Sequence, residues 1–288
     1  MSGIIHAESK PFVVTGASGS IGSEVVKALA RQGKPVVMAC RNLEKGEAVR
    51  ECILQAVPDA ALELMAVDMA SLASVCRFAD ALKERWNTLG GLFNNAGTMN
   101  RHYGLTEDGF ENTLQVNYLA PYLLTRKLQP LLNDGGHLVN MVSLTRYIAK
   151  VDRGLFERGE KDFRQLGAYS DSKLALLLFT IALAKRVAFP VNMADPGVVN
   201  SNMIRMDRWF DPLADRLFRP FCKTPAQGAV PAVKALNCEN HLFFHRGNKA
   251  FALPEKYQEH PDLEWLWQET EQRLSDKAIT LSMISSTS

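Results

Sequence analysis

Short apolar runs alternate along the chain with stretches in which apolar residues recur every three or four positions. The runs predict buried β-strands, and the recurring spacing predicts amphipathic helices. The predicted strands cover residues 12–14, 35–39, 62–67, 91–93, 137–142, 191–194 and 248–252. The predicted helices cover residues 23–33, 43–56, 72–86, 106–131 and 166–187.

This alternation of apolar strands and helices predicts a parallel sheet covered by helices on both faces. Right-handed crossovers make it a doubly wound α/β fold of the Rossmann type, with about seven strands. Neither a repeat nor a linker divides the chain, so we expect one domain over residues 11–275. Residues 1–10 then form an N-terminal extension, and residues 276–288 a flexible tail. Ligands of such folds bind beyond the carboxyl ends of the strands.

Charge and hydropathy indicate which classes of binding partner the chain is not expected to have. The 288 residues include 33 Lys and Arg against 31 Asp and Glu, and this near-neutral balance argues against a nucleic-acid-binding protein. The longest apolar run, Leu174–Ala184, would span only ~16 Å as a helix, which is too short to cross a bilayer. Residues 1–10 contain no apolar leader, so we expect a cytoplasmic protein without a membrane span.

The cysteine and histidine pattern gives no sign of a metal site. The five cysteines are scattered without C-x-x-C spacing, and the six histidines include no H-E-x-x-H. We therefore expect reduced thiols and no bound metal.

A glycine-rich turn follows the first predicted strand. Gly16, Gly19 and Gly22 allow a tight reversal in which the backbone approaches a pyrophosphate at the positive N-terminus of the next helix. A purely structural turn is the alternative for this motif taken alone.

The end of the second predicted strand bears on the choice of cofactor. Folds that bind NAD usually carry Asp or Glu there for the ribose 2′-hydroxyl, whereas this chain carries Arg41. A guanidinium pairs with a 2′-phosphate, so NADP(H) is favoured over NAD(H). A solvated loop charge is the alternative for Arg41. Asp68, after the third strand, would accept a hydrogen bond from adenine or act as a helix N-cap.

Tyr169 and Lys173 are four residues apart and therefore share one face of the predicted helix over residues 166–187. A phenol with an ordinary pKa of about 10 is a poor acid–base catalyst at neutral pH. A nearby ammonium stabilises the phenolate and lowers the pKa. Tyrosine can then exchange a proton with a carbinol oxygen while hydride moves.

These motifs come in a fixed order along the chain, with Asn94–Gly97 after the fourth strand, Ser143 after the fifth and Pro196–Gly197 after the sixth. Taken singly, Ser143 reads as a strand-end turn residue and Asn117 as a helix hydrogen-bonding residue. As an ordered set they resemble the short-chain dehydrogenase/reductase family from about residue 12 to residue 274. The resemblance is strongest to its retinol dehydrogenase and carbonyl reductase branch, through VVMACRNLEKGEA, VNYLAPYLLT, AYSDSKLALLLFT and DPGVV.

The resemblance implies roles for individual residues. Tyr169 would be the acid/base, Lys173 would lower its pKa and hold the nicotinamide ribose, Ser143 would bind the substrate oxygen, and Asn117 would anchor a relay water. The residues implied around the dinucleotide, besides Tyr169 and Lys173, are Gly16, Ser18, Gly19, Ser20, Ile21, Gly22, Arg41, Asp68, Met69, Asn94, Ala96, Gly97, Pro196, Gly197, Val199 and Ser201.

The chain departs from the family pattern in the glycine turn. Compact members read T-G-x-x-x-G-x-G, whereas here the middle glycine, Gly19, comes one position early, as in the epimerase and dehydratase branch. Ser201 replaces a common threonine and keeps the hydroxyl.

The segment of residues 200–225 carries apolar residues at every fourth position and is predicted to be a lid over an apolar substrate; a core helix or a membrane-contact segment is the alternative. The expected activity is NADP(H)-dependent interconversion of a small hydrophobic ketone or aldehyde and its alcohol. A cofactor-binding sensor without turnover, or a nucleotide-sugar epimerase or dehydratase, are the alternatives. The apolar run Leu174–Ala184 predicts a homodimer or homotetramer, and a buried core helix is the alternative.

Overall fold

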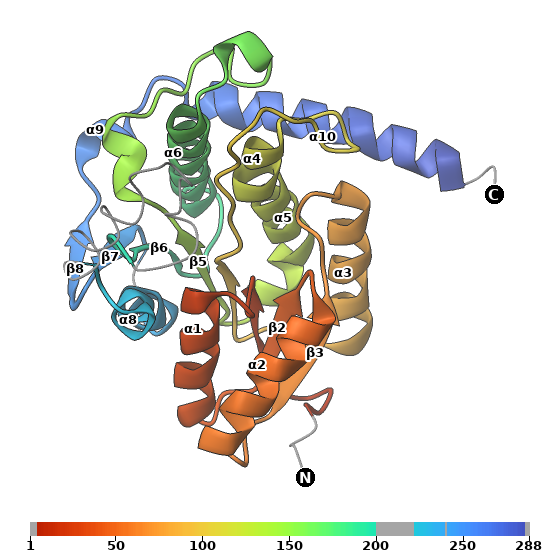
Figure 1. Cartoon of the computed structure of the whole chain (residues 1–288), viewed down its shortest axis with the longest axis vertical. Helices are drawn as coiled ribbons and strands as arrows, with labels where there is room; N and C mark the ends of the chain where they lie inside the picture. The colour runs from red at the N-terminus through yellow and green to blue at the C-terminus, as the bar shows by residue number, and fades with distance from the viewer. Residues whose placement is uncertain (1–4, 200–221, 240, 286–288) are drawn as a thin grey trace, which may run out of the picture.

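The computed structural model describes residues 5–199, 222–239 and 241–285. Its centre is an eight-stranded sheet with the order β3-β2-β1-β4-β5-β6-β7-β8, in which only the β7–β8 pair is antiparallel (Figure 1). The strands are β1 (Phe12–Thr15), β2 (Val36–Cys40), β3 (Leu62–Ala66), β4 (Gly91–Asn94), β5 (His137–Met141), β6 (Val191–Asp195), β7 (Phe243–Arg246) and β8 (Lys249–Ala252). The doubly wound parallel fold predicted from the sequence is confirmed.

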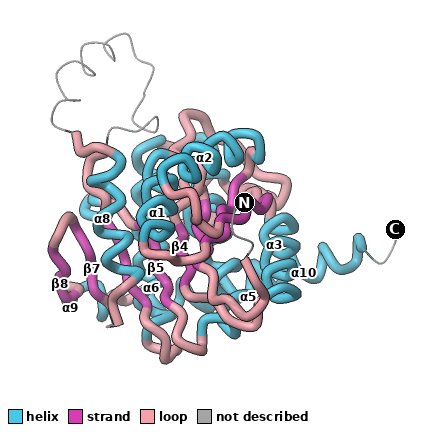
Figure 2. The backbone as a smooth tube through the Cα atoms, turned by 90° about the horizontal axis from the view of Figure 1, so that it is seen from below, coloured by secondary structure: helices cyan, strands magenta, loops and turns pink. Residues whose placement is uncertain are grey.

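Helices cover both faces of the sheet (Figure 2). The main helices are α1 (Ser20–Arg31), α2 (Leu43–Ala56), α3 (Leu72–Arg85), α5 (Ala120–Leu132), α6 (Gln165–Ala184), α8 (Pro225–Leu236) and α10 (Leu263–Ser285). The short ones are α4 (Asn112–Leu114), the π-helical turn η1 (Gln115–Leu119), the 3₁₀ turns η2 (Leu144–Tyr147) and η3 (Glu160–Asp162), and α9 (Glu255–Gln258).

The core has two halves, one on each face of the sheet. Along β1, Val13 packs with the half that contains α3, α5 and α6, and Val14 packs with the half that contains α1 and α8. This alternation follows from the period-2 geometry of a strand, and it explains why the central strands are buried at every position. Because these strands are parallel, their carboxyl ends lie at one edge of the sheet, where the loops that follow them meet.

Three parts of the chain differ from the sequence prediction. The helix expected to begin at Thr106 begins at Asn112, because Gly109 (φ +81°) forms a turn in which Gly109 donates to the Thr106 carbonyl. Strand β7 and helices α8, α9 and α10 follow residue 221 and were not predicted. Helix α10 continues past residue 275, where a flexible tail was expected, and the Lys277 ammonium lies 5.8 Å from the Phe110 ring centroid.

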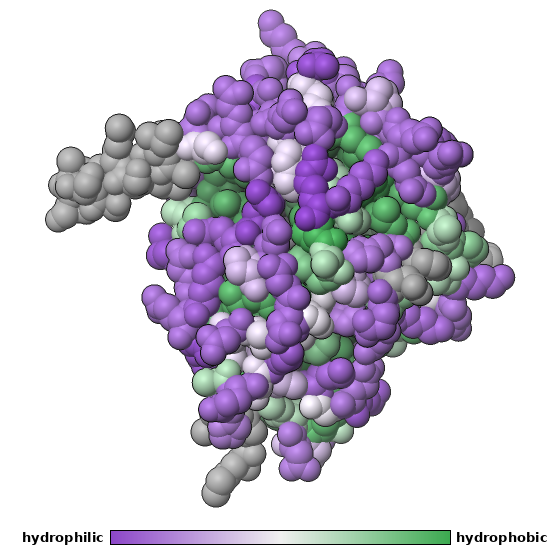
Figure 3. Space-filling view, turned by 180° about the vertical axis from the view of Figure 1, so that it is seen from behind, coloured by the Kyte–Doolittle hydropathy of each residue, from purple (hydrophilic) through white to green (hydrophobic). Residues whose placement is uncertain are grey.

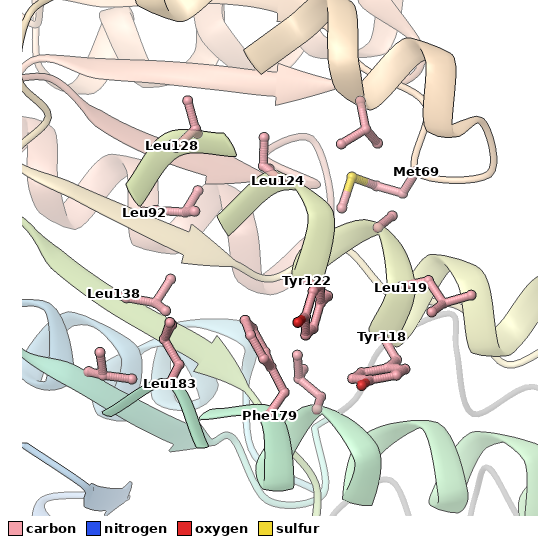
Figure 4. Packing of buried hydrophobic residues seen from close by; sticks show 14 of the residues in the cluster. Met69, Leu92, Tyr118, Leu119, Tyr122, Leu124, Leu128, Leu138, Phe179 and Leu183 are labelled. Atoms are coloured by element: carbon pink, nitrogen blue, oxygen red, sulfur yellow. The ribbon is translucent and has the colours of Figure 1, made fainter. Parts of the chain in front are cut away.

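Helix α6 is apolar on all sides because it is buried on all sides. Phe179 of α6 packs against Tyr122 of α5, with ring centroids 4.4 Å apart (Figure 4), and against Trp267 of α10, with centroids 5.9 Å apart. By length and composition alone α6 is apolar enough to cross a membrane, but most of it is buried inside the chain, as in the core helix of a soluble protein. The apolar run is therefore explained by packing within the chain, and the homodimer or homotetramer stays a prediction.

The surface on the side opposite to Figure 1 is mostly hydrophilic, with apolar patches between the polar side chains (Figure 3). Most of the exposed large apolar side chains among the described residues lie in the segments that follow the strands. They are Leu43, Leu105, Tyr147, Ile148, Leu166 and Val198, with Phe251 on β8 as the exception.

Candidate active site

The glycine turn connects β1 to the N-terminus of α1. Gly16 has a φ of +63°, and a Cβ there would lie 3.0 Å from the Cα of Ala96. A Cβ on Gly22 would lie 2.3 Å from the Gly16 carbonyl oxygen. These two positions therefore require glycine, one for its backbone conformation and both for their close contacts.

Gly19, which comes one position earlier than in the family pattern, has a different role. It is the N-cap of α1 with an extended φ of −81°, and no side chain caps the first turn of this helix. The first-turn N–H groups, which include that of the exposed Ser20, are therefore left uncapped at the positive end of the helix. This arrangement fits an anionic phosphate, so the shifted spacing preserves the backbone site.

Asn95 holds the turn against the loop after β4. Its side-chain amide donates to the carbonyls of Thr15 at 2.9 Å and Gly16 at 3.2 Å, and its backbone N–H donates to the Thr15 hydroxyl at 3.0 Å. The sequence analysis included Asn95 in a motif but gave it no role. Asn94, predicted beside the cofactor, is buried and donates to Asn140 and Thr125, so its side chain belongs to the core.

The residues expected to determine cofactor preference follow the neighbouring strands β2 and β3. Arg41 follows β2 and is exposed, while Cys40 before it is buried and contacts the Ser18 hydroxyl. Burial raises the pKa of the Cys40 thiol, which keeps it neutral beside the turn. Asp68 is not the N-cap of α3, since Ser71 has that position. One oxygen of Asp68 accepts from the Ala70 N–H at 2.9 Å.

The Ser143 hydroxyl at the end of β5 acts as a hydrogen-bonding neighbour of the Tyr169 phenol on α6. The Ser143 oxygen accepts from the N–H and the hydroxyl of Thr145, both at 3.2 Å. Because these two bonds occupy the acceptor capacity of Ser143, its own proton is left to point toward Tyr169. The structure thus brings together the two hydroxyls that the sequence analysis placed 26 residues apart along the chain.

Lys173 lies one helical turn after Tyr169, with its ammonium 6.0 Å from the centroid of the Tyr169 ring. It is 2% exposed and donates to the Met141 carbonyl at 2.8 Å. Burial lowers the pKa of Lys173 to about 8.

The pKa of Tyr169 does not follow the expectation. Burial, joined by the negative charge of Asp195, raises it, and the hydrogen bond with Ser143 opposes the rise. The prediction that Lys173 lowers the pKa of Tyr169 is wrong for the chain without a cofactor, because the ammonium is itself desolvated and directed at Met141. The phenol is therefore protonated at neutral pH.

Asn117 lies in the π-helical turn η1, a feature that often marks functional sites. Its side-chain oxygen accepts from the Thr98 N–H at 2.8 Å, and its amide donates to the Thr98 carbonyl at 2.9 Å and the Ser172 hydroxyl at 3.0 Å. The side chain therefore joins the loop after β4 to α6. Both amide hydrogens of Asn117 are used, whereas its side-chain oxygen keeps a second lone pair. Its role in holding the relay water stays a prediction.

A buried ion pair that the sequence analysis did not identify lies behind Ser143. Arg146 in η2 and Asp195 at the end of β6 are 3.3 Å apart, with side chains 5% and 1% exposed. A charged residue ending an apolar strand, as in the run Val191–Asp195, was the available signal, because an ionised group is rarely buried without a partner.

The remaining predicted residues lie along the same edge. Met69 is buried, Pro196 and Gly197 turn away from β6, and Val199 pairs with Lys223. Ser201 and the expected lid up to residue 221 lie outside the described residues.

A cavity of about 560 Å³ lies beside α6, between its first two turns and residues 148–164. Asp171 in its lining accepts from the Lys150 N–H at 2.6 Å and pairs with Arg158. Tyr169, Ser143 and Lys173 do not line it, so this cavity is not the reaction site.

The fold and this arrangement define a class of protein. A doubly wound sheet, a glycine turn at an uncapped helix N-terminus and a cluster of Ser143, Tyr169 and the buried Lys173 at the same strand edge are the parts of a dinucleotide-dependent oxidoreductase. The family model described as short chain dehydrogenase matches residues 10–209. The chain belongs to the short-chain dehydrogenase/reductase family of NAD(P)-dependent oxidoreductases.

Relatives of known name agree with the family. The chain is 36% identical to retinol dehydrogenase 12 of Mus musculus, over 82% of this chain and 76% of that protein. It is 37% identical to polyprenol dehydrogenase of Mus musculus, over 77% and 70%. It is also 34% identical to the WW domain-containing oxidoreductase of Gallus gallus over 78% of this chain, and it spans 57% of that longer protein.

Solved structures show the same fold. An uncharacterized protein from Mycobacterium Paratuberculosis superposes with a TM-score of 0.74 at 27% identity, over 94% of this chain and 95% of that chain. A short chain dehydrogenase from Shigella flexneri superposes with a TM-score of 0.63 at 22% identity, over 84% and 98%.

Proposed function

We propose that the protein is an NADP(H)-dependent oxidoreductase that interconverts a small hydrophobic ketone or aldehyde and its alcohol. The observation that carries the proposal is that Ser143 and Tyr169 come together at the carboxyl ends of the strands, with Lys173 one helical turn after Tyr169.

The chain's residues fit the dinucleotide. The uncapped N-terminus of α1 and the glycine turn suit the pyrophosphate, and the exposed Arg41 suits the 2′-phosphate. Lys173 is a buried ammonium whose hydrogen bond to the Met141 carbonyl leaves two donors for ribose hydroxyls. When bound, the reduced nicotinamide supplies a hydride to the carbonyl carbon. The relative from Shigella flexneri is described as complexed with NADP, which agrees with this choice.

In this proposal the protein's residues handle the proton. Ser143 donates a hydrogen bond to the substrate oxygen, and Tyr169 transfers its phenolic proton to that oxygen as negative charge develops. Because burial and Asp195 raise the pKa of Tyr169, the protonated form is present at neutral pH. Carbonyl reduction requires this form, so we propose reduction as the favoured direction at neutral pH.

The apolar substrate is supported by the surface around the site. Tyr147 and Ile148 after β5 and Val198 after β6 are exposed apolar side chains in the segments that adjoin Ser143 and Gly197. Retinol and polyprenol, in the names of two relatives, are apolar alcohols.

The test is oxidation of NADPH, followed by absorbance, over a panel of apolar ketones and aldehydes. We expect turnover by the native chain and a loss of about 10²–10⁴-fold in kcat in Tyr169→Phe. Tyr257→Phe, a buried tyrosine of α9 outside the site, is the control and should keep native turnover. Equal turnover by native protein and Tyr169→Phe would remove the proposed role. Tight NADPH binding without turnover on the whole panel would support a sensor instead.

A further inference from the structure

The ion pair of Arg146 and Asp195 connects the two loops that border the Tyr169 hydroxyl. Arg146 donates to the Ser143 carbonyl at 2.9 Å and to Asp195 at 3.3 Å. The other oxygen of Asp195 accepts from the Gly197 N–H at 2.8 Å. The Arg146–Asp195 pair thus connects Ser143, after β5, with the turn at Gly197, after β6.

Burying the two charged side chains of this pair costs free energy, so we expect the pair to serve a purpose other than stability. Replacing a buried ion pair with apolar residues is often neutral or stabilising, so burial of these two charges is weak evidence for a stabilising role. Both side chains are almost fully buried, and neither sits in the middle of a strand or long helix, where it would fix register. Their contacts are instead with Ser143, Gly197 and the hydroxyl of Tyr147.

The pair also shapes the charge around Tyr169. Lys173 approaches from α6, Asp195 from the end of β6, and Arg146 lies behind Ser143. Lys223 lies beside Gly197, and Arg246, the neighbour of Asp195 on β7, is exposed. Because Asp195 acts on Tyr169 through its charge, the guanidinium that pairs with Asp195 offsets that charge.

We propose that Arg146 and Asp195 are positioning residues of the reaction, which hold Ser143 and Gly197 around the Tyr169 hydroxyl and keep the buried charge beside it balanced. The inference rests on the proposed function of Tyr169. It assigns the pair a task that acts through Ser143 and Tyr169 and involves no contact with substrate.

The test follows the ionisation of residue 169 directly. 3-Fluorotyrosine incorporated at position 169 reports its own protonation by ¹⁹F NMR, and its phenol is more acidic than that of tyrosine, which keeps the titration in an accessible range. Asp195→Asn leaves the Arg146 charge unbalanced, so its midpoint should fall by about 1 pH unit or more. Arg146→Gln leaves the Asp195 charge unbalanced, so its midpoint should rise. The double variant should return toward the native midpoint.

Two further variants complete the design. Arg146→Lys keeps the charge and loses the planar guanidinium, whose Nη1 reaches both the Ser143 carbonyl and Asp195, so kcat should fall about tenfold or more while the midpoint stays within a few tenths of a unit. Asp134→Asn removes a carboxylate from an exposed ion pair with Lys10 and should change neither. If Arg146→Gln fails to fold, the lowered midpoint of Asp195→Asn and its return toward native in the double variant still test the inference.

An unchanged midpoint in folded Asp195→Asn, or a double variant whose midpoint stays as far from the native value as that of Asp195→Asn, would overturn the inference, whether or not the native chain turns over NADPH. If the midpoints of Asp195→Asn and Arg146→Gln shift in opposite directions but the native protein shows no turnover, the inference about charge balance stands and the proposed function is refuted.

Discussion

Lys173 is the residue whose chemistry the site depends on most after Tyr169. It is a buried ammonium that donates to a neutral carbonyl, and among the described groups no carboxylate is found to raise its pKa. Burial lowers that pKa to about 8, from about 10.5 in the unfolded chain. Between these values the unfolded chain binds more protons than the folded one, so this group makes stability rise with pH. Below pH 8 the charged lysine costs the folded state up to about 3 kcal/mol.

We therefore predict that Lys173→Met is more stable than the native chain at pH 7, by about 1–3 kcal/mol after the lost hydrogen bond to Met141 is counted. The advantage should shrink as the pH rises from 8 to 10.5. Urea unfolding at pH 7 and pH 10 measures it, and Lys185→Met, at the exposed end of α6, is the control. A destabilised Lys173→Met at pH 7 would show that the ammonium has a stronger partner than Met141.

Arg41 carries the prediction about cofactor choice. Arg41→Asp replaces the proposed 2′-phosphate contact with a carboxylate that suits a ribose 2′-hydroxyl. The KM for NADPH should rise about 10–100-fold, as expected for loss of a charged hydrogen bond, and the KM for NADH should fall. Arg31→Asp, at the opposite end of α1, is the matched control. An unchanged KM for NADPH in Arg41→Asp would exclude Arg41 from the cofactor site.

For individual residues, the sequence predicts a contact when the two residues lie close together along the chain. Tyr169 and Lys173 lie one helical turn apart, so their shared face follows from helix geometry alone. Arg146 and Asp195 are 49 residues apart, and their contact depends on β5 and β6 being neighbours in register. The pKa of Tyr169 was predicted wrongly for a related reason, because the direction of the Lys173 ammonium depends on the Met141 carbonyl of another element.

At the scale of elements, α10 is the part that the sequence analysis did not foresee. Its Thr270 hydroxyl bonds the Tyr118 hydroxyl at 2.6 Å, and its Glu271 accepts from Tyr122 at 2.6 Å and Arg126 at 2.8 Å. Figures 1 and 2 show α10 running across the ends of the helices on one face and extending beyond them. Its mixed pattern of Trp, Glu and Arg gives no clear apolar stripe, because its aromatic side chains pack between charged partners.

Trp267 lies at the centre of the contact between α10 and the helices α5 and α6. Its ring packs on Phe179 and Tyr122, and the guanidinium carbons of Arg186 and Arg126 lie 4.4 Å and 5.0 Å from its centroid. Trp267→Ala should lower the free energy of unfolding by about 2–4 kcal/mol, since the ring is only partly buried. Urea unfolding followed by circular dichroism measures the change. Gln268→Ala, on the exposed side of α10, should stay within about 0.5 kcal/mol of native, and an equally small change in Trp267→Ala would contradict the packing role.

The predictions that failed for elements have local causes. The stretch of residues 106–111 was predicted as the start of a helix, but Phe110 is its single apolar residue, and Gly109 takes a positive φ at which the backbone turns. Strand β7 is four residues long and pairs with β8 through a tight hairpin, so it has too few residues to show a period. The central strands were predictable because both of their faces are buried.

At the scale of the whole molecule, the sheet order brings the site together. β1, β4, β5 and β6 are consecutive neighbours, so the glycine turn, Asn95, Ser143 and Gly197 all leave the same edge. The order could be predicted from right-handed crossovers in a doubly wound fold, and the edge follows from the strands being parallel. The substrate does not follow from this geometry, since the sheet fixes only where the chemistry takes place.

In the proposed reaction Tyr169 delivers a proton while hydride reaches the carbonyl carbon. The most direct measurement uses NADPH with deuterium at both C4 positions of the nicotinamide and an apolar ketone that the native chain reduces, with the product analysed by mass spectrometry. We expect deuterium on the carbinol carbon, formed about 10²–10⁴-fold more slowly by Tyr169→Phe although NADPH binding is unchanged. Formation of labelled product at the native rate by Tyr169→Phe, or an alcohol without the label, would contradict it.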